Sequence, residues 1–316
     1  MAMQFDPSIF GGLRTFEVAA RVLSFTKAAE ILNITQSAVS QQIRHLEQRL
    51  GYPLFIRHHG RLSLTQHGQV LFDASARAFQ DIERALTRLG TEGSVLQVSC
   101  LPSFALEWLG PRLPDFHQAN PGLVVRLKAE FPHALNRQAI RESGVDAAIR
   151  LDPRDKEEND AEPILDEYLL PVATPEYLAQ HPEFASGQSM RGITLLHDGM
   201  PWEGAPEFIE WRTWLALNRP DWLPGLEGIQ FNLGSLAIRA ALNHQGVAMA
   251  RTALVGGEIR SGRLVNVFNS HVLSPAHYVV LTEHHDNPDL YRFKQWLQQE
   301  CQRFDQSRTL WLPEKA

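Results

Sequence analysis

The chain has 316 residues, 44% of them hydrophobic, and its 36 acidic residues outnumber its 30 basic residues, which gives a net charge of −6. This length allows two or three compact units, each with its own core. No apolar run approaches the roughly 18–20 residues that a membrane-spanning helix needs, and the amino-terminal segment lacks the basic start and apolar core of a secretory signal. We therefore expect neither a membrane protein nor an exported one, but a protein of the cytoplasm.

Residues 24–64 have the pattern of a helix-turn-helix followed by a basic hairpin. The first helix is short, and its apolar face consists of Ala28, Ala29, Ile31 and Leu32. Asn33 then tolerates the left-handed conformation that a tight turn between helices needs, and Thr35 can cap a second helix. The second helix has a buried stripe at spacings of four, three and four, formed by Val39, Ile43, Leu46 and Leu50.

The opposite face of this second helix is polar. Its short or forked side chains can contact base edges and phosphates. The residues that we expect at the DNA are Thr35, Gln36, Ser37, Ser40, Gln41 and Arg44. The alternative is that they form only the polar face that any amphipathic helix pair presents to water.

A basic hairpin is expected after the second helix. Gly51 ends the helix, residues 53–56 are apolar and strand-like, and Gly60 stands at the tip of a basic turn. Arg57 and Arg61 would hold phosphates or enter the minor groove, unless they only increase the solubility of a loop.

The charge distribution supports a DNA-binding head. Residues 1–66 contain seven lysines and arginines and four acidic residues, a net +3, so residues 67–316 carry −9. A basic head on an acidic body suits a DNA-binding protein. Because +3 is modest, useful affinity would need several heads acting together.

The sequence of residues 13–69 resembles the amino-terminal signature of LysR-type transcriptional regulators. The matching segments are FEVAARVLSFTKAA, TQSAVSQQI, LEQRLGYPLF and LTQHG. LSFTKAA and the later segment DAAIR (146–150) also resemble the subgroup of glycine-cleavage activators and β-lactamase regulators. The resemblance implies a dimer of dimers, a homotetramer, that binds and bends promoter DNA, contacts RNA polymerase and responds to a small effector.

Residues 71–89 predict one long helix without proline or internal glycine. A heptad seam runs along it, formed by Leu71, Ser75, Ala78, Ile82, Ala85 and Leu89. Phe72, Phe79 and Leu86 flank the seam. The seam can pack on its own domain or, as the resemblance implies, against the same helix of a second chain. Gly90 and Gly93 then mark a hinge and the most probable domain boundary.

From Val95 onward, short apolar runs alternate with helical stretches, which predicts an α/β body with parallel strands. The expected strands are 95–101, 123–130, 146–151, 168–173, 194–197, 228–231, 246–250, 264–268 and 278–282. The expected helices are 106–119, 135–143, 176–180, 210–217, 236–244 and 289–304.

Two lobes joined by crossing strands near 169–174 and 271–275 would accommodate these elements, an architecture shared with periplasmic solute-binding proteins, as the resemblance also implies. The expected domains are a winged helix-turn-helix (1–68), a linker helix and hinge (69–93), a two-lobed α/β effector domain (94–306) and a tail (307–316). Lobe I would comprise 94–168 and 275–306, and lobe II would comprise 169–274.

Ligands in α/β sheets lie beyond the carboxyl ends of strands and near helix amino termini. The residues expected there are Ser103, Phe104, Phe131, Arg150, Thr174, His197, Phe231, Asn232 and Tyr278. Arg150 suits a carboxylate or phosphate, so the effector would be anionic. Alternatively, Ser103 and Thr174 are simple helix caps, Arg150 pairs with Asp146 or Asp152, and His197 is structural.

No enzyme is expected, because the chain has no GxGxxG, Walker, GxSxG or HExxH motif. No cofactor or metal is expected either, since His284, His285 and Asp286 suit an exposed loop better than a metal site. Cys100 and Cys301 form no redox or metal motif and are interpreted as plain thiols, with a redox pair as the alternative. The competing function is a cytoplasmic solute sensor that acts mainly through protein contacts and binds DNA weakly.

Overall fold

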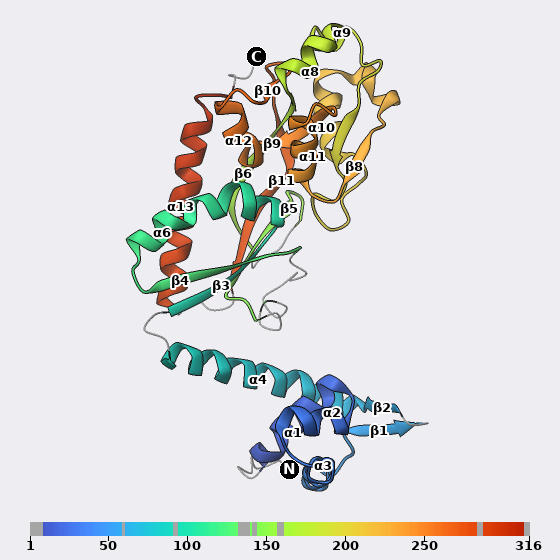
Figure 1. Cartoon of the computed structure of the whole chain (residues 1–316), viewed down its shortest axis with the longest axis vertical. Helices are drawn as coiled ribbons and strands as arrows, with labels where there is room; N and C mark the ends of the chain where they lie inside the picture. The colour runs from blue at the N-terminus through green and yellow to red at the C-terminus, as the bar shows by residue number, and fades with distance from the viewer. Residues whose placement is uncertain are drawn as a thin grey trace. The chain divides into compact units, whose positions relative to one another are not determined.

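The computed structural model describes residues 9–58, 61–90, 94–131, 140, 144–156, 161–282 and 287–312. The chain divides into two compact units, Met1–Glu92 and Gly93–Ala316. Figure 1 shows short helices, a hairpin and a long helix in the first unit, and a sheet flanked by helices in the second. Each unit is described by itself.

The first unit contains the predicted helix-turn-helix and hairpin, preceded by a helix that packs on both. Its elements are α1 (Ile9–Val22), α2 (Phe25–Leu32), α3 (Gln36–Leu50), β1 (Phe55–His58), β2 (Arg61–Leu64) and α4 (Gln66–Gly90). Asn33 ends α2 in the left-handed conformation with φ 53°, Thr35 Oγ1 accepts from Ala38 N, and Gly51 ends α3 with φ 81°. Local chemistry therefore sets the turn as predicted.

An aromatic cluster forms the centre of this head. Phe55 meets both Phe16 and Phe25 edge to face, with ring centroids 5.5 and 5.2 Å apart. The stripe of α3 is buried as predicted at Val39, Ile43 and Leu46, while Leu50 is partly buried. The prediction for Ile31 was wrong, because its side chain is 50% exposed; helical periodicity alone does not reveal which neighbour covers a face.

The long helix α4 begins five positions before the predicted start, because Thr65 Oγ1 accepts from Gly68 N and caps it. Gly68 permits its close approach to the hairpin, since a Cβ there would lie 2.1 Å from the Leu54 carbonyl oxygen. The first part of the seam serves the head itself: Leu71 packs on its core and Ser75 is buried. Farther along, Ile82 is 49% exposed and Leu86 61% exposed.

In the described part of the second unit, nine strands form one mixed sheet of order β4-β3-β5-β11-β6-β9-β7-β8, with β10 on β6. They are β3 (Ser94–Cys100), β4 (Leu123–Ala129), β5 (Ala147–Pro153), β6 (Glu162–Ala173), β7 (Leu195–Asp198), β8 (Ile229–Phe231), β9 (Val247–Arg251), β10 (Val265–Asn266) and β11 (Val272–Thr282). β3 is parallel to β4 and β5, and β7 is parallel to β8 and β9.

The crossing strands are longer than predicted. β6 and β11 pair antiparallel to each other along both lobes, from Val280↔Glu162 in lobe I to Val272↔Leu169 in lobe II, and they lie side by side in Figure 1. The strand predicted at 278–282 is thus the second half of the crossing strand that was predicted at 271–275. The sheet is mixed rather than parallel, because both crossing strands run antiparallel to their neighbours.

Helices cover the sheet of the second unit. They are α5 (Pro102–Phe104), a π-helix (Ala105–Leu109), a 3₁₀ turn (Gly110–Arg112), α6 (Leu113–Ala119), α8 (Pro175–Gln180), α9 (Pro182–Ala185), α10 (Ile209–Asn218), a second 3₁₀ turn (Pro220–Gly225), α11 (Gly234–Leu242), α12 (Thr252–Arg260) and α13 (Pro288–Arg308). Helix α12 was not predicted. The helix expected at 135–143 lies outside the described residues except for Ile140. Among the described helices, none is both long and apolar enough to cross a membrane.

Each lobe has its own aromatic core. In lobe I, Phe104 stacks on Trp108 and contacts Tyr278, with ring centroids 4.8 and 4.1 Å apart. In lobe II, Trp211 and Trp214 are fully buried beside β7 and β9. The lobe I core continues into lobe II through Leu170, Leu196 and Ile238, so packing as well as the crossing strands joins the two lobes.

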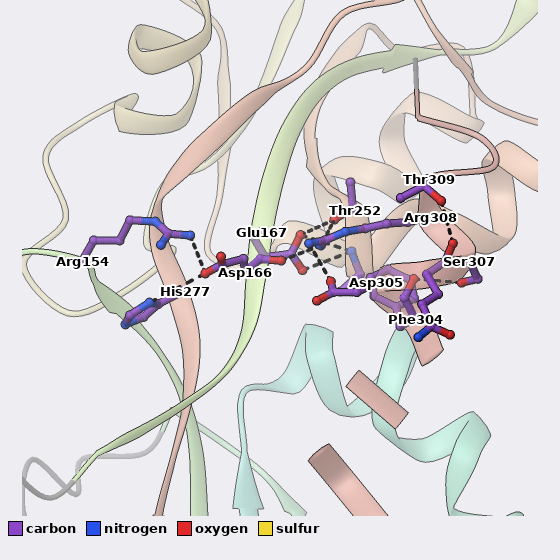
Figure 2. A network of polar contacts seen from close by, with 12 residues as sticks. Arg154, Asp166, Glu167, Thr252, His277, Phe304, Asp305, Ser307, Arg308 and Thr309 are labelled. Carbon is purple, nitrogen blue, oxygen red and sulfur yellow. Dashed lines mark hydrogen bonds and ion pairs between the residues drawn. The ribbon is translucent and has the colours of Figure 1, made fainter. Parts of the chain in front are cut away.

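A polar network fastens the carboxyl-terminal helix to the crossing strand β6 (Figure 2). Arg308 of α13 is 5% exposed and donates to the Asp166 carbonyl oxygen at 2.5 Å and to Thr252 Oγ1 at 3.3 Å. Its Nη2 also pairs with Asp305 at 2.6 Å. The neighbouring Glu167 is fully buried and accepts from Thr252 Oγ1 at 2.6 Å and from Ala253 N at 3.1 Å.

We predict that Arg308→Met lowers the free energy of unfolding by about 2–4 kcal/mol, because it leaves a buried carbonyl and a hydroxyl without their donor. Arg303→Met is the matched control on the same helix, since the Arg303 side chain is 70% exposed and its partner Glu300 keeps a second pair with Arg112; it should change stability by less than about 1 kcal/mol. Urea unfolding of both variants measures the difference, and equal losses would contradict a structural role for the Arg308 contacts.

Candidate functional site

The polar face of α3 is exposed where the sequence predicts it. Gln36, Ser37, Gln41 and Arg44 are exposed and Ser40 is partly exposed. Thr35 Oγ1 is already engaged as the cap and also lies 2.9 Å from Ser37 Oγ. The Arg44 guanidinium folds back on its own helix, since Nε donates to Ser40 O at 3.3 Å. This face offers donors and acceptors of the kind that read base edges.

The hairpin beside α3 is present, with Arg57 opposite Leu62 and His58 opposite Arg61 in register. The side chains of Arg57 and Arg61 and the tip at residues 59–60 lie outside the described residues. Glu47 of α3 holds the start of the hairpin against this helix, because its Oε1 accepts from Leu54 N at 2.7 Å and from Phe55 N at 3.3 Å. Helix and hairpin are therefore held in a fixed relation.

A pocket of about 450 Å³ opens in the second unit, between residues of lobe I and the segment that follows β7 in lobe II. Its lobe I wall consists of Leu101, Phe131, Arg150, Leu151, Asp152, Pro153 and Lys156. Its lobe II wall consists of Met200, Trp202, Glu203 and Gly204. A pocket of this size, with an apolar lining and a few polar groups, is typical of small-molecule sites.

Arg150 is 4% exposed in this wall and pairs with Asp152, with 2.5 Å between Nη2 and Oδ2. Lys156 Nζ lies 3.2 Å from the same carboxylate oxygen. Arg150 does not end its strand as predicted, because β5 continues to Pro153. Of the two alternatives open for Arg150, the pair with Asp152 is present and lies in the pocket wall.

A second, smaller pocket of about 10 Å³ adjoins the first and shares Leu101, Phe131 and Met200 with it. Its lining also includes the predicted residues Ser103, Phe104, Asn232 and Tyr278. Phe104 and Tyr278 are fully buried in the core, so they form its floor. So small a space holds little more than one water molecule.

Three predicted residues line neither pocket. Thr174 caps α8, as the alternative for it allowed, and its Oγ1 lies 2.6 Å from His244 Nδ1. His197 is 1% exposed and its ring packs on Phe208, with centroids 4.2 Å apart. Phe231 packs partly buried against the core. Ser103 is not a cap, because Leu101 occupies the cap position of α5.

Two charged residues at the smaller pocket were missed, and both end a strand. Arg251 at the end of β9 forms a buried ion pair with Asp198 at the end of β7. Arg251 Nε also lies 3.2 Å from Glu210 Oε1, and burial raises the pKa of Glu210. The strand-end rule would have found Asp198, but the predicted strand stopped one residue early and selected His197 instead.

Among the described residues, no cluster of histidine, cysteine and acidic side chains could hold a metal ion; His284–Asp286 lie outside them. Both cysteines are buried free thiols, and burial raises the pKa of each well above its ordinary value. The thiolate is the reactive form, so these environments disfavour redox chemistry at either position.

Comparison with known proteins matches residues 10–69 to the bacterial regulatory helix-turn-helix protein of the lysR family and residues 89–302 to the LysR substrate binding domain. The chain is 37% identical over 295 residues to the glycine cleavage system transcriptional activator of Escherichia coli K12, covering 90% of this chain and 91% of that protein. It is 34% identical over 299 residues to the transcriptional activator AmpR of Providencia stuartii, covering 92% and 96%.

Among solved structures, ArgP from Mycobacterium tuberculosis superposes with a TM-score of 0.59 at 19% identity, covering 94% of this chain and 98% of that one. This likeness supports the fold of both units.

The buried ring of His197 predicts acid sensitivity. Burial lowers the pKa of His197 to about 4, from an ordinary value of 6.5, so the folded state binds fewer protons between these values. Its stabilising contribution is complete above about pH 6.5 and is lost as the pH falls toward 4. We expect the wild-type chain to lose about 2–3 kcal/mol more than His197→Gln between about pH 7 and pH 4.5. Urea unfolding at both pH values measures this, and equal losses in the two proteins would contradict the assignment.

Proposed function

This chain belongs to the LysR family of transcriptional regulators, and from that premise we propose how its described residues act. Its head binds duplex DNA in a sequence-specific manner, and a small effector in the cleft of the second unit controls that binding. The observation that carries the proposal is the exposed polar face of α3, held on a buried core by a capped turn.

In the proposed complex, α3 lies in the major groove. Gln41 and Arg44 contact base edges, and the polar residues Thr35, Gln36, Ser37 and Ser40 contact bases or phosphates near the amino-terminal end of the helix. Arg57 and Arg61 of the hairpin hold phosphates or enter the minor groove. The charge of the head alone supports only weak binding, so paired heads on pseudo-palindromic half-sites are required.

We propose that the exposed part of α4 pairs the heads. Ile82 and Leu86 present apolar surface that a soluble helix normally buries. Their stripe fits the same stripe of a second chain, and two such dimers form the tetramer that the family resemblance implies. Residues 1–68 are assigned to the head, 69–93 to the linker and hinge, 94–306 to the effector domain and 307–316 to a tail.

The effector is proposed to be an anion held between lobe I (94–168 and 275–306) and lobe II (169–274). Buried Arg150 supports this assignment, because a guanidinium binds carboxylates with two parallel hydrogen bonds. An effector that binds one arrangement of the lobes more tightly shifts the population toward it, which changes DNA bending and contact with RNA polymerase. The protein acts in the cytoplasm, where bacterial DNA is transcribed, and not as an enzyme.

We predict that Gln41→Ala and Arg44→Ala each weaken binding to the preferred duplex about tenfold to a hundredfold, because each removes a base or phosphate contact. The preferred duplex comes from selection on randomised DNA with the full-length chain at two salt concentrations. Gln48→Ala, exposed on the same helix but farther from its amino-terminal end, is the control and should bind as the wild type does.

Unchanged sequence specificity in a variant that combines Gln41→Ala with Arg44→Ala would show that α3 is not the recognition helix. Selection that enriches no sequence, with binding that vanishes as salt rises, would instead favour the solute sensor that acts through protein contacts.

We predict that Ile82→Glu dissociates the chain into smaller species at micromolar concentration, because it places an unpaired carboxylate in an apolar helix pair. Val70→Glu introduces the same charge on an exposed apolar position of α4, where Val70 is 68% exposed, but away from the seam; it should leave the mass unchanged. Sedimentation velocity measures both, and an unchanged mass for Ile82→Glu would contradict pairing through α4.

A further inference from the structure

Two adjoining pockets of the second unit differ in size, and we call the narrow one the closed end and the wide one the open end of the cleft between the lobes. They share Leu101, Phe131 and Met200, so they lie next to each other. The closed end offers about 10 Å³, and the open end offers about 450 Å³. Of these two pockets, the open end is the one with room for the body of a ligand.

A contact between the lobes engages a serine at the closed end. Ser103 of lobe I and Ser235 at the start of α11 in lobe II have their Oγ atoms 3.1 Å apart. Ser235 N also donates to Ser103 Oγ at 3.0 Å. The Ser103 hydroxyl, which was predicted to meet a ligand, is occupied by the protein itself.

The open end combines apolar walls with a buried cation. Phe131 from lobe I and Met200 and Trp202 from lobe II line it, so large apolar side chains come from both sides. Arg150 lies in the same wall and is only 4% exposed. A site of this composition favours a ligand with an apolar body and one anionic group.

The charged residues around Arg150 further limit the chemical class of the ligand. Asp152 is 7% exposed and already accepts from both Arg150 and Lys156. A ligand ammonium would compete with these cations for the carboxylate, which disfavours a zwitterionic amino acid. A phosphate dianion would face the Asp152 carboxylate at close range, whereas a carboxylate matches one guanidinium with a single charge. Glu203, on the opposite wall, is exposed.

We propose that the effector is a monocarboxylate with a large apolar or aromatic body, whose carboxylate binds Arg150 and whose body packs between Phe131, Met200 and Trp202. This proposal rests on the proposed control of the protein by an effector in the cleft. The proposal names the chemical class of the effector. It also places the effector in the open end of the cleft and not at Ser103, where the sequence predicted a ligand contact.

The test uses the purified full-length chain and isothermal titration with aryl-alkanoates from phenylacetate to phenylhexanoate. Each acid has a neutral twin, its primary amide, which keeps the shape and loses the charge. We expect at least one acid to bind and its amide to bind about tenfold to a hundredfold more weakly, because the charge-assisted contact with Arg150 is lost. Glycine, serine and inorganic phosphate should bind more weakly than that acid.

Variants locate the bound acid. Arg150→Met should weaken acid binding to the level of the amide and leave amide binding unchanged, a pattern that a merely misfolded variant would not give. Trp202→Leu should weaken acid and amide alike, because the apolar contact is common to both. Arg303→Met, on the exposed face of α13, is the matched control and should bind as the wild type does.

Three outcomes would overturn the proposed ligand class. They are equal binding of an acid and its amide, tighter binding of glycine, serine or phosphate than of every acid, and no binding of any acid. A separate assay of DNA binding keeps the two proposals apart. If the acid binds through Arg150 but the chain selects no DNA sequence, the class stands and the proposed function fails. If an amino acid but no aryl-alkanoate alters specific DNA binding, the function stands and the class fails.

Discussion

The antiparallel pairing of β6 with β11 is the constraint on which the cleft depends. Both strands pass through both lobes, and their register shifts between Leu273 and His277. At that shift, Arg154 joins the strands, since it donates to Ser274 O at 2.9 Å and pairs with Asp166 at 2.8 Å (Figure 2). The pairing of the crossing strands is therefore irregular where the lobes meet, at this shift and at a second one between Tyr278 and Val279.

On the other side of β6, the same strand organises the helices. Glu167 caps α12 from a distant part of the chain by accepting from Ala253 N, and Arg308 brings α13 to the same place. Burying a carboxylate is costly unless its hydrogen bonds are satisfied, and burial accordingly raises the pKa of Glu167. The helices cannot shift on β6 without exposing or orphaning this group, so the network gives the sheet a defined helical layer.

The sequence predicts the head well and the cleft poorly, for a physical reason. Asn33, Thr35 and Gly51 act on neighbours within a few positions, and such local chemistry is readable from the chain. Helix α12 was missed because Gly256 and Gly257 weaken its intrinsic preference and its cap comes from Glu167. Tertiary contacts decide such an element.

The cleft shows the same limit. The sequence predicts Arg150 as a pocket residue because it lies at the end of an apolar run. It leaves Asp146 and Asp152 open as partners, and the pair with Asp152 follows from the continuation of β5 to Pro153. Asp198 and Arg251 meet although they are far apart in sequence, and nothing local marks either as a partner of the other. The chemistry of a pocket depends on which strand ends are brought together, and that follows from topology.

The first turns of α4 pack on the head, and its later turns present an exposed apolar stripe. The spacing between these two parts matters for the proposed pairing of the heads. Its first turns are fixed to the head through Leu71 and Ser75, whereas Ile82 and Leu86 face away from that core. Each residue of an α-helix advances by about 100° around the axis, so the helical phase between these two parts is set by the number of residues separating them. One inserted residue would swing the apolar stripe by more than a quarter turn relative to the recognition helix. In the proposed helix pair, the length of this segment would therefore set the rotation of the two heads relative to each other.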